Sequence, residues 1–293
     1  MAIGDPHGAR ADTWLASPGE APGLVVAGLP SGVDRVPAAF RAVLARFTTL
    51  DGETGTDLSR LAVTDLGDWE VTGLGATEEV ASRARRLAGG PVAAFIGGDG
   101  AVARPLIGGL ARGDLSEVGL LTLDARHDVL ASAREPADRT WLRSLIEDGL
   151  PDGRVVQVGT RSFADTAPAR AFCAEHGIEV VTMETVEEVG AGWVVTSALR
   201  DLRERCAWIF LVADLGVLDA AFAPGCPQAG PGGMTPRHLT AACRAAGAHP
   251  GVRAAGFGGV GPLPDPAGPT MLNLATAFLA FASGVASREV PNA

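Results

Sequence analysis

The chain has 293 residues, of which 47% are hydrophobic and 20% are charged, so it can bury a large core and is not expected to be disordered. Its formal net charge of −10 argues against nucleic acid or an anionic membrane surface as a partner. The four cysteines form no Cys-x-x-Cys pair, which argues against a zinc or redox motif and favours a reducing, cytoplasmic location.

The N-terminal segment, residues 1–22, is rich in Gly, Pro, Ala and Asp and lacks the apolar run of a signal peptide. We therefore expect it to be a flexible arm. No stretch of the chain reaches about 18 uninterrupted apolar residues, so no membrane span is expected. Residues 23–293 contain no clear linker or internal repeat and are predicted to form a single domain.

Short apolar segments alternate with helical patterns along residues 23–293. The predicted strands are Leu24–Leu29, Leu61–Leu66, Val92–Ile96, Gly119–Leu123, Arg154–Val158, Ile178–Met183, Trp208–Ala213 and Val252–Phe257. Between most of them apolar residues recur at helical spacing, as in Val36–Phe47. This alternation predicts an α/β fold of three layers, in which helices cover both faces of a mostly parallel sheet of about eight strands.

Polar chemistry is concentrated after the fourth predicted strand. A run of apolar residues, typical of a strand buried on both faces, leads into Asp124, Arg126, His127 and Asp128. Asp214 follows the seventh strand in the same way. Because ligands bind at the carboxyl ends of the strands in open α/β sheets, we expect these five side chains to line one binding pocket.

Motifs at several strand ends occur in a recognisable order. The relevant stretches are Gly97–Gly100, Asp124–Asp128, Ala213–Ala220 and Gly225–Thr235. Together they resemble the motifs of the ureohydrolase family, which includes arginase, agmatinase, guanidinobutyrase and formimidoylglutamase. The resemblance covers roughly residues 24 to 287 and implies an arginase-like fold. Gly97–Gly100 alone also resembles the phosphate-binding loop of NAD kinases, but nothing downstream supports that alternative.

The resemblance implies a metal site that this chain retains only in part. The family holds two manganese ions with two His and four Asp, and a bridging hydroxide attacks a guanidinium carbon. Asp124, Asp128 and Asp214 match three of the six ligands. The other three ligand positions are occupied by Gly100, Arg126 and Gly216, and the family's guanidinium-binding Glu aligns with Gly230.

Arg126 stands where the family has a metal-binding imidazole. Its guanidinium stays charged and binds no metal, whereas three carboxylates without a cation would repel one another. We therefore expect Arg126 to pair with Asp124, Asp128 or Asp214, and we expect no cofactor. The alternatives are that Arg126 is simply solvated and that His127 is a hydrogen-bonded structural residue.

Two functional hypotheses follow. The preferred one is a catalytically degenerate homologue, a pseudoenzyme that acts as a structural or regulatory subunit. The family's assemblies imply a trimer or hexamer, built with itself or with an active paralogue. The alternative is a metal-dependent hydrolase of a guanidino or amidine compound. It would use one divalent ion (manganese, nickel or zinc) on Asp124, Asp128 and Asp214, with His127 as the candidate catalytic residue.

Overall fold

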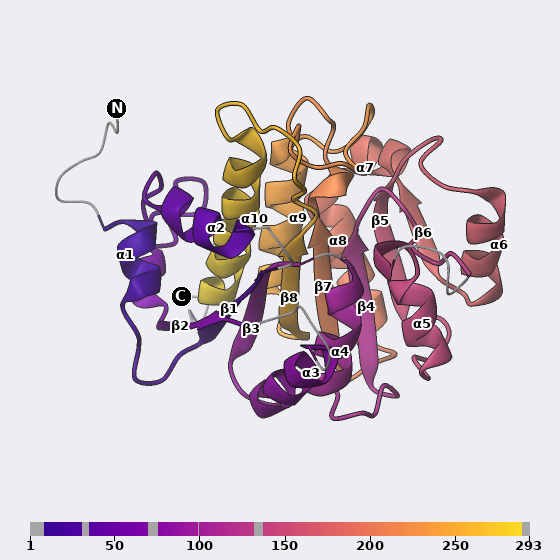
Figure 1. Cartoon of the computed structure of the whole chain (residues 1–293), viewed down its shortest axis with the longest axis horizontal. Coiled ribbons are helices and arrows are strands. Elements are labelled where there is room, and N and C mark those ends of the chain that lie inside the picture. Colours follow the sequence, from indigo (N-terminus) through magenta and orange to yellow (C-terminus); the bar gives the residue numbers. More distant parts are fainter. Residues whose placement is uncertain (1–8, 31–34, 70–75, 99, 132–136, 289–293) are drawn as a thin grey trace.

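The computed structural model describes residues 9–30, 35–69, 76–98, 100–131 and 137–288. In this part of the chain eight strands form one parallel sheet in the order β2-β1-β3-β8-β7-β4-β5-β6 (Figure 1). The strands are β1 (Leu24–Leu29), β2 (Val63–Asp68), β3 (Val92–Gly97), β4 (Val118–Leu123), β5 (Val155–Thr160), β6 (Glu179–Thr182), β7 (Trp208–Asp214) and β8 (Val252–Gly258). The predicted α/β fold with about eight strands is confirmed.

Helices cover both faces of this sheet (Figure 1). They are α1 (Ala11–Ala16), α2 (Val36–Leu44), α3 (Ala76–Leu87), α4 (Ala103–Leu110), α5 (Trp141–Glu147), α6 (Ala167–Glu175), α7 (Met183–Val189), α8 (Ala191–Arg203), α9 (Pro236–Ala248) and α10 (Pro269–Ser287). The core is divided by the sheet. Val26 of β1 packs in the cluster that contains α2, α8, α9 and α10, whereas its neighbour Val25 packs in the cluster that contains α3, α4, α5 and α6. Because successive strand side chains point to opposite faces, this division gives three layers.

Residues 10–22 differ from the expected flexible arm. Helix α1 buries Ala11, Trp14 and Leu15, and the indole of Trp14 donates a hydrogen bond to the carbonyl of Leu61 over 2.9 Å. Burial of one indole outweighs a composition rich in small residues, because an aromatic side chain removes a large apolar area from water. Residues 1–8 of the predicted arm lie outside the described residues.

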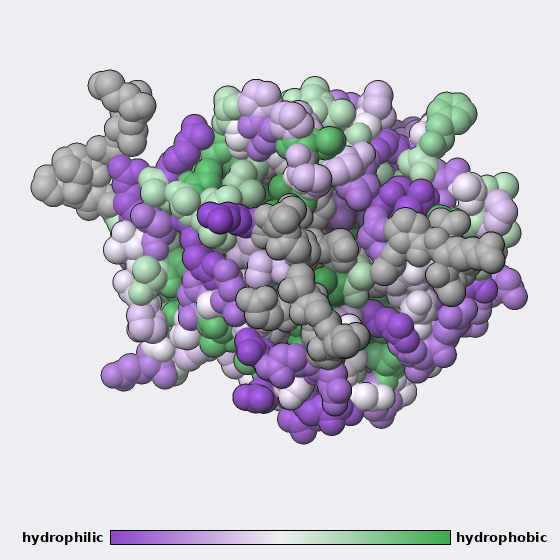
Figure 2. Space-filling model, viewed as in Figure 1, coloured by the Kyte–Doolittle hydropathy of each residue, from purple (hydrophilic) through white to green (hydrophobic). Residues whose placement is uncertain are grey.

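The longest helix, α10, is part of the core. It has the length and apolar composition of a membrane-crossing helix, but 61% of its apolar window is buried inside the molecule. Phe278 of α10 contacts the rings of Trp14, Phe40 and Phe257. On the face shown in Figure 2, hydrophobic areas are small and are separated by hydrophilic residues.

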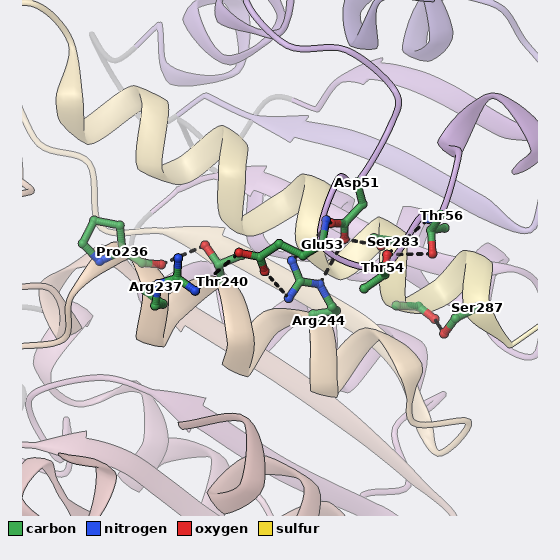
Figure 3. Close-up of polar contacts among 11 residues, drawn as sticks. Asp51, Glu53, Thr54, Thr56, Pro236, Arg237, Thr240, Arg244, Ser283 and Ser287 are labelled. Carbon is green, nitrogen blue, oxygen red and sulfur yellow. Dashed lines mark hydrogen bonds and ion pairs between the residues drawn. The ribbon is translucent and has the colours of Figure 1, made fainter. Parts of the chain in front are cut away.

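The loop between α2 and β2 is fixed to α9 and α10 by charged groups (Figure 3). Arg244 of α9 donates a hydrogen bond from Nε to Oδ2 of Asp51 over 3.0 Å, and Ser283 of α10 donates to the same oxygen over 2.7 Å. Arg244 also lies 3.0 Å from a carboxylate oxygen of Glu53. One partly buried carboxylate therefore holds two helices and a loop together.

Candidate functional site

The five predicted site residues lie at one edge of the sheet. Asp124, Arg126, His127 and Asp128 directly follow β4, and Asp214 ends the neighbouring strand β7. The two strands pair in parallel with Leu123 opposite Ala213, so both deliver their next residues to the same place. The strand-end rule that motivated the prediction thus places these side chains correctly.

Asp124 and Asp128 are buried carboxylates, with 4% and 5% of their surface exposed. Burial, and then the charges of Asp128 and Asp214, raise the pKa of Asp124 well above its ordinary value. Burial also raises the pKa of Asp128 to about 6, although the Arg126 charge opposes this shift. Both shifts show that the positive charge available here does not compensate fully for desolvation and mutual repulsion.

Arg126 is the cation of this cluster, and it is not solvated. Its Nη2 lies 3.6 Å from Oδ1 of Asp128 and 3.7 Å from a carboxylate oxygen of Asp138. Burial lowers the pKa of Arg126, but the surrounding carboxylates outweigh burial and raise it overall. Both distances exceed hydrogen-bonding range, so the interaction is electrostatic. Within the described residues, Nε of Arg126 and Oδ1 of Asp128 have no hydrogen-bond partner.

Neighbouring side chains occupy the space beside three glycines of the motifs. A Cβ atom on Gly100 would lie 2.7 Å from the indole of Trp141, and one on Gly230 would lie 2.8 Å from the guanidinium of Arg161. A Cβ atom on Gly216 would lie 2.8 Å from the carboxylate of Asp214. Larger residues at these positions would therefore require their neighbours to move.

These residues do not fit a centre of two manganese ions. Of the six ligand positions implied by the resemblance, Gly100 and Gly216 offer no ligand atom and Arg126 offers only donors. In the described part of the chain, no three His, Cys, Asp or Glu side chains are grouped closely enough to hold an ion. The chemistry of Asp124, Asp128 and Asp214 nevertheless suits one hard divalent ion, because such ions take carboxylate oxygens.

His127 is buried and held in one orientation. The side-chain amide of Gln157 donates from Nε2 to the carbonyl of His127 over 3.0 Å, so its Oε1 is the atom 2.7 Å from Nδ1 of His127. An oxygen accepts, and Nδ1 of the neutral ring must therefore carry the proton. This tautomer leaves Nε2 with a free lone pair.

Two cavities adjoin the cluster. A cavity of about 220 Å³ is lined by Arg126, Asp128 and Asp214, among others. A larger one of about 610 Å³ lies beyond the ends of β5 and β6, and its charged lining residues are Arg161, Asp165, Arg170, Glu184 and Glu187. His127 also lines the larger cavity.

Arg161 lines the larger cavity. It donates to the backbone carbonyls of Gly216 and Gln228 over 2.7 and 2.5 Å. The charged residues of the larger cavity were not predicted as site residues from the sequence. The strand-end rule, applied to β5 and β6, was the signal that could have found them.

Comparisons with known proteins give consistent results. The model of the Arginase family matches residues 27–283. The chain is 35% identical over 218 residues to formimidoylglutamase of Halalkalibacterium halodurans, covering 70% of this chain and 66% of that protein. It is 26% identical over 259 residues to formimidoylglutamase of Bacillus subtilis, covering 82% and 79%.

Solved structures show the same fold. The crystal structure of formimidoylglutamase from Bacillus subtilis matches with a TM-score of 0.88 at 22% identity, covering 99% of this chain and 96% of that one. Trypanosoma cruzi formiminoglutamase with Mn²⁺ matches with a TM-score of 0.83 at 22% identity, covering 96% and 99%.

The comparisons correct two predictions. The preferred prediction of a non-catalytic subunit is wrong, because the relatives in sequence are formimidoylglutamases, which are enzymes. The prediction that no cofactor is expected is also wrong, because a formiminoglutamase of the same fold is solved with Mn²⁺. Both predictions gave too much weight to the ligands that are missing at Gly100, Arg126 and Gly216. They gave too little weight to the three carboxylates that remain at the carboxyl ends of β4 and β7.

Proposed function

We infer, since this chain belongs to the arginase family, that it is a metal-dependent hydrolase that cleaves a C–N bond of a linear amidine. An N-formimidoyl amino acid is the substrate that the names of its relatives favour. The observation that carries the proposal is the set of carboxylates Asp124, Asp128 and Asp214 at the carboxyl ends of β4 and β7. Their chemistry, and the raised pKa values of Asp124 and Asp128, favour the approach of a cation.

Asp124, Asp128 and Asp214 would hold one divalent ion, with manganese, nickel and zinc as the candidates. When bound, such an ion lowers the pKa of a water molecule and makes it a nucleophile near neutral pH. The proposal requires the three carboxylates to turn towards one another, because they are not grouped as an ion site in the described conformation. It also requires Arg126 to leave room for the ion, which its long contacts of 3.6 and 3.7 Å permit.

His127 has the properties of a proton carrier for this reaction. Hydrolysis of a formimidoyl amino acid breaks the bond between the formimidoyl carbon and the amine nitrogen, and it releases formamide and the free amino acid. The leaving nitrogen must gain a proton. His127 lines the larger cavity, and its Nε2 is unprotonated in this tautomer, so Nε2 can accept a proton from the attacking water and donate it to that nitrogen.

The larger cavity supports the amino-acid part of the substrate. Its volume of about 610 Å³ is within the usual range for a small-molecule site. Arg170 can bind a carboxylate, whereas Glu184 and Glu187 can bind an ammonium or amidinium group. Both signs of charge around one cavity suit a zwitterion better than a simple anion or cation.

Turnover under defined metal conditions tests the proposal. The chain is stripped with a chelator, dialysed with Mn²⁺, Ni²⁺ or Zn²⁺, and incubated with N-formimidoyl-L-glutamate, arginine, agmatine or guanidinobutyrate. We expect formamide and glutamate from the first substrate and about one bound ion per chain. Asp124→Asn should abolish product formation and ion binding. The control Asp152→Asn, at a position 64% exposed, should retain product formation and ion binding. Absence of product and of bound ion under all these conditions would refute the proposal.

The expected assembly and location stay proposals as well. We propose a homo-trimer or homo-hexamer in the cytoplasm, as the family resemblance and the unpaired thiols suggest. Native mass spectrometry of the purified chain measures the assembly directly.

A further inference from the structure

A third cavity lies at the opposite edge of the sheet from the candidate site. Its volume is about 400 Å³, and it is bounded by the segments that precede β3, β7 and β8. Trp208, the first residue of β7, lines it together with Arg203 of α8 and Arg253 of β8. The other walls are mainly small or apolar, with Leu87, Pro91 and Leu110 among them.

The charged groups at this cavity are all cationic. Arg203 and Arg253 line it directly, and neither forms an ion pair with an acidic residue of the described chain. Arg288 lies close enough to Arg253 to feel its charge, and burial together with that charge lowers the pKa of Arg288 to about 10. In a chain with a net charge of −10, a group of arginines without acidic partners is unusual.

The hydrogen bonds of these arginines do not neutralise them. Arg203 donates from Nη1 to the carbonyl of Cys206 over 2.5 Å, and Arg253 donates from Nη2 to the carbonyl of Gly90 over 2.6 Å. Each guanidinium has five N–H donors, so most remain available for another acceptor.

We propose that this cavity binds a small organic anion, in which a carboxylate or phosphate is attached to a flat apolar body. A guanidinium group such as that of Arg203 or Arg253 can form two parallel hydrogen bonds with a carboxylate or phosphate, and the aromatic side chain of Trp208 lines the same cavity. A neutral or cationic compound of the same shape should be rejected, because it would leave the two guanidinium groups without an acceptor.

The location separates this cavity from the candidate site. β7 runs from Trp208 at this cavity to Asp214 at the candidate site, about 20 Å away at the usual rise of a strand. β3 and β8 span the same two edges. The site is nevertheless defined by binding alone, so it does not depend on the proposed hydrolase activity.

Calorimetric titration of the full chain with matched probes tests the proposal. The probes are 2-naphthoate, its amide, the corresponding amidine, and inorganic phosphate. We expect saturable binding of naphthoate and at least tenfold weaker binding of the amide and amidine. Binding of phosphate as tightly as naphthoate would show that Trp208 and the apolar walls contribute nothing, and would overturn that part of the proposal.

Two variants locate the binding. Arg253→Gln and Arg203→Gln should each weaken naphthoate binding at least tenfold, whereas Arg200→Gln, on the same helix as Arg203 and 71% exposed, should leave it unchanged. Circular dichroism checks that each variant is folded. If Arg203→Gln unfolds, two other measurements decide whether naphthoate binds in this cavity. One is its affinity for Arg253→Gln, and the other is the fluorescence quenching by naphthoate in the parent compared with that in Trp208→Phe. Unchanged affinity in folded Arg253→Gln, or no binding of naphthoate, would overturn the proposal.

Discussion

The indole of Trp141 donates a hydrogen bond from Nε1 to Oδ2 of Asp128 over 3.1 Å. The same indole lies 2.7 Å from the position that a Cβ atom on Gly100 would take. One aromatic ring thus holds a site carboxylate and fills the space in front of a motif glycine. Trp141 is 4% exposed and Asp128 has a positive φ of 51°, so the contact is made in a tightly packed and locally strained region.

The first prediction concerns this packing. Gly100→Ala should lower the free energy of unfolding by about 1–3 kcal/mol, because the new methyl group would collide with the indole of Trp141. In a Trp141→Leu background the same substitution should cost much less, since the obstructing ring is gone. Urea denaturation of the four proteins in this double-mutant cycle measures the difference.

Gly108→Ala is the matched control for that cycle. Gly108 lies within α4, and a Cβ atom there would meet nothing within 4 Å. This variant should be about 0.5–1 kcal/mol more stable than the parent, because alanine favours a helix. An equal cost of Gly100→Ala with and without Trp141 would contradict the packing described here.

A second prediction concerns pH and Asp128. Its folded pKa of about 6 lies above the ordinary value of 3.8, so the folded chain holds a proton that the unfolded chain releases between these values. The contribution of this group to stability is therefore present below about pH 4 and lost as the pH rises through about 6. The loss should be about 3 kcal/mol for a shift of this size, and Asp124 should add a loss of the same sign.

Urea titrations between pH 4 and 7 in chelator measure this loss. Asp128→Asn should flatten the curve in this window, whereas Asp114→Asn, at a fully exposed carboxylate, should not. Added Mn²⁺ should reverse the trend, because a bound cation stabilises the ionised carboxylates. A parent protein whose stability rises from pH 4 to 7 in chelator, with Asp128→Asn unchanged from it, would contradict the assignment.

The sequence determined the fold more completely than the site. Apolar runs such as Leu24–Leu29 match a strand from end to end, because a strand buried on both faces needs an uninterrupted apolar segment. Helix α1 was mistaken for a loose arm, since its composition gives no sign that Trp14 is buried. Helix α7 follows β6 directly and carries only two buried residues, Met183 and Val186, so its apolar periodicity is weak.

The prediction that the site carboxylates lie together depended on the order of the strands in the sheet. Asp124 and Asp214 come together because β4 and β7 are neighbours, which motif order and the family resemblance made foreseeable. The contact between Gly100 and Trp141 joins residues 41 positions apart and depends on side-chain packing that no periodicity encodes. Arg161 is similar, since its two acceptors are backbone carbonyls of distant loops. Backbone partners leave no signature in the sequence.

A third prediction concerns the clamp between the α2–β2 loop and the two C-terminal helices (Figure 3). Burial alone would raise the pKa of Asp51, but hydrogen bonds from Ser283 and from the backbone of Glu53, with the charge of Arg244, lower it overall. Its contribution to stability is thus present above about pH 4 and is lost as the pH falls. Asp51→Asn should cost about 1.5–3 kcal/mol at pH 7 and clearly less at pH 3.

Thermal and urea unfolding at the two pH values measure this contribution. Glu53→Gln provides the comparison, because Glu53 is 56% exposed and its ion pairs should contribute less than about 1 kcal/mol. If Asp51→Asn were as stable as Glu53→Gln at pH 7, the carboxylate of Asp51 would not be the group that joins the loop to α9 and α10.

The fourth prediction concerns the tautomer of His127. Gln157 fixes the proton on Nδ1, so long-range ¹H–¹⁵N spectra at neutral pH should show a protonated Nδ1 and an unprotonated Nε2. Gln157→Leu removes both hydrogen bonds from a buried imidazole and a buried carbonyl, which should cost about 2–5 kcal/mol and release the tautomer. Cys173→Ala is the control, because its sulfur makes only a 3.8 Å contact with the same amide oxygen. A protonated Nε2 in the parent would exclude His127 as the proton acceptor of the proposed hydrolysis, whereas the Nδ1–H form, lost only in Gln157→Leu, would support that role.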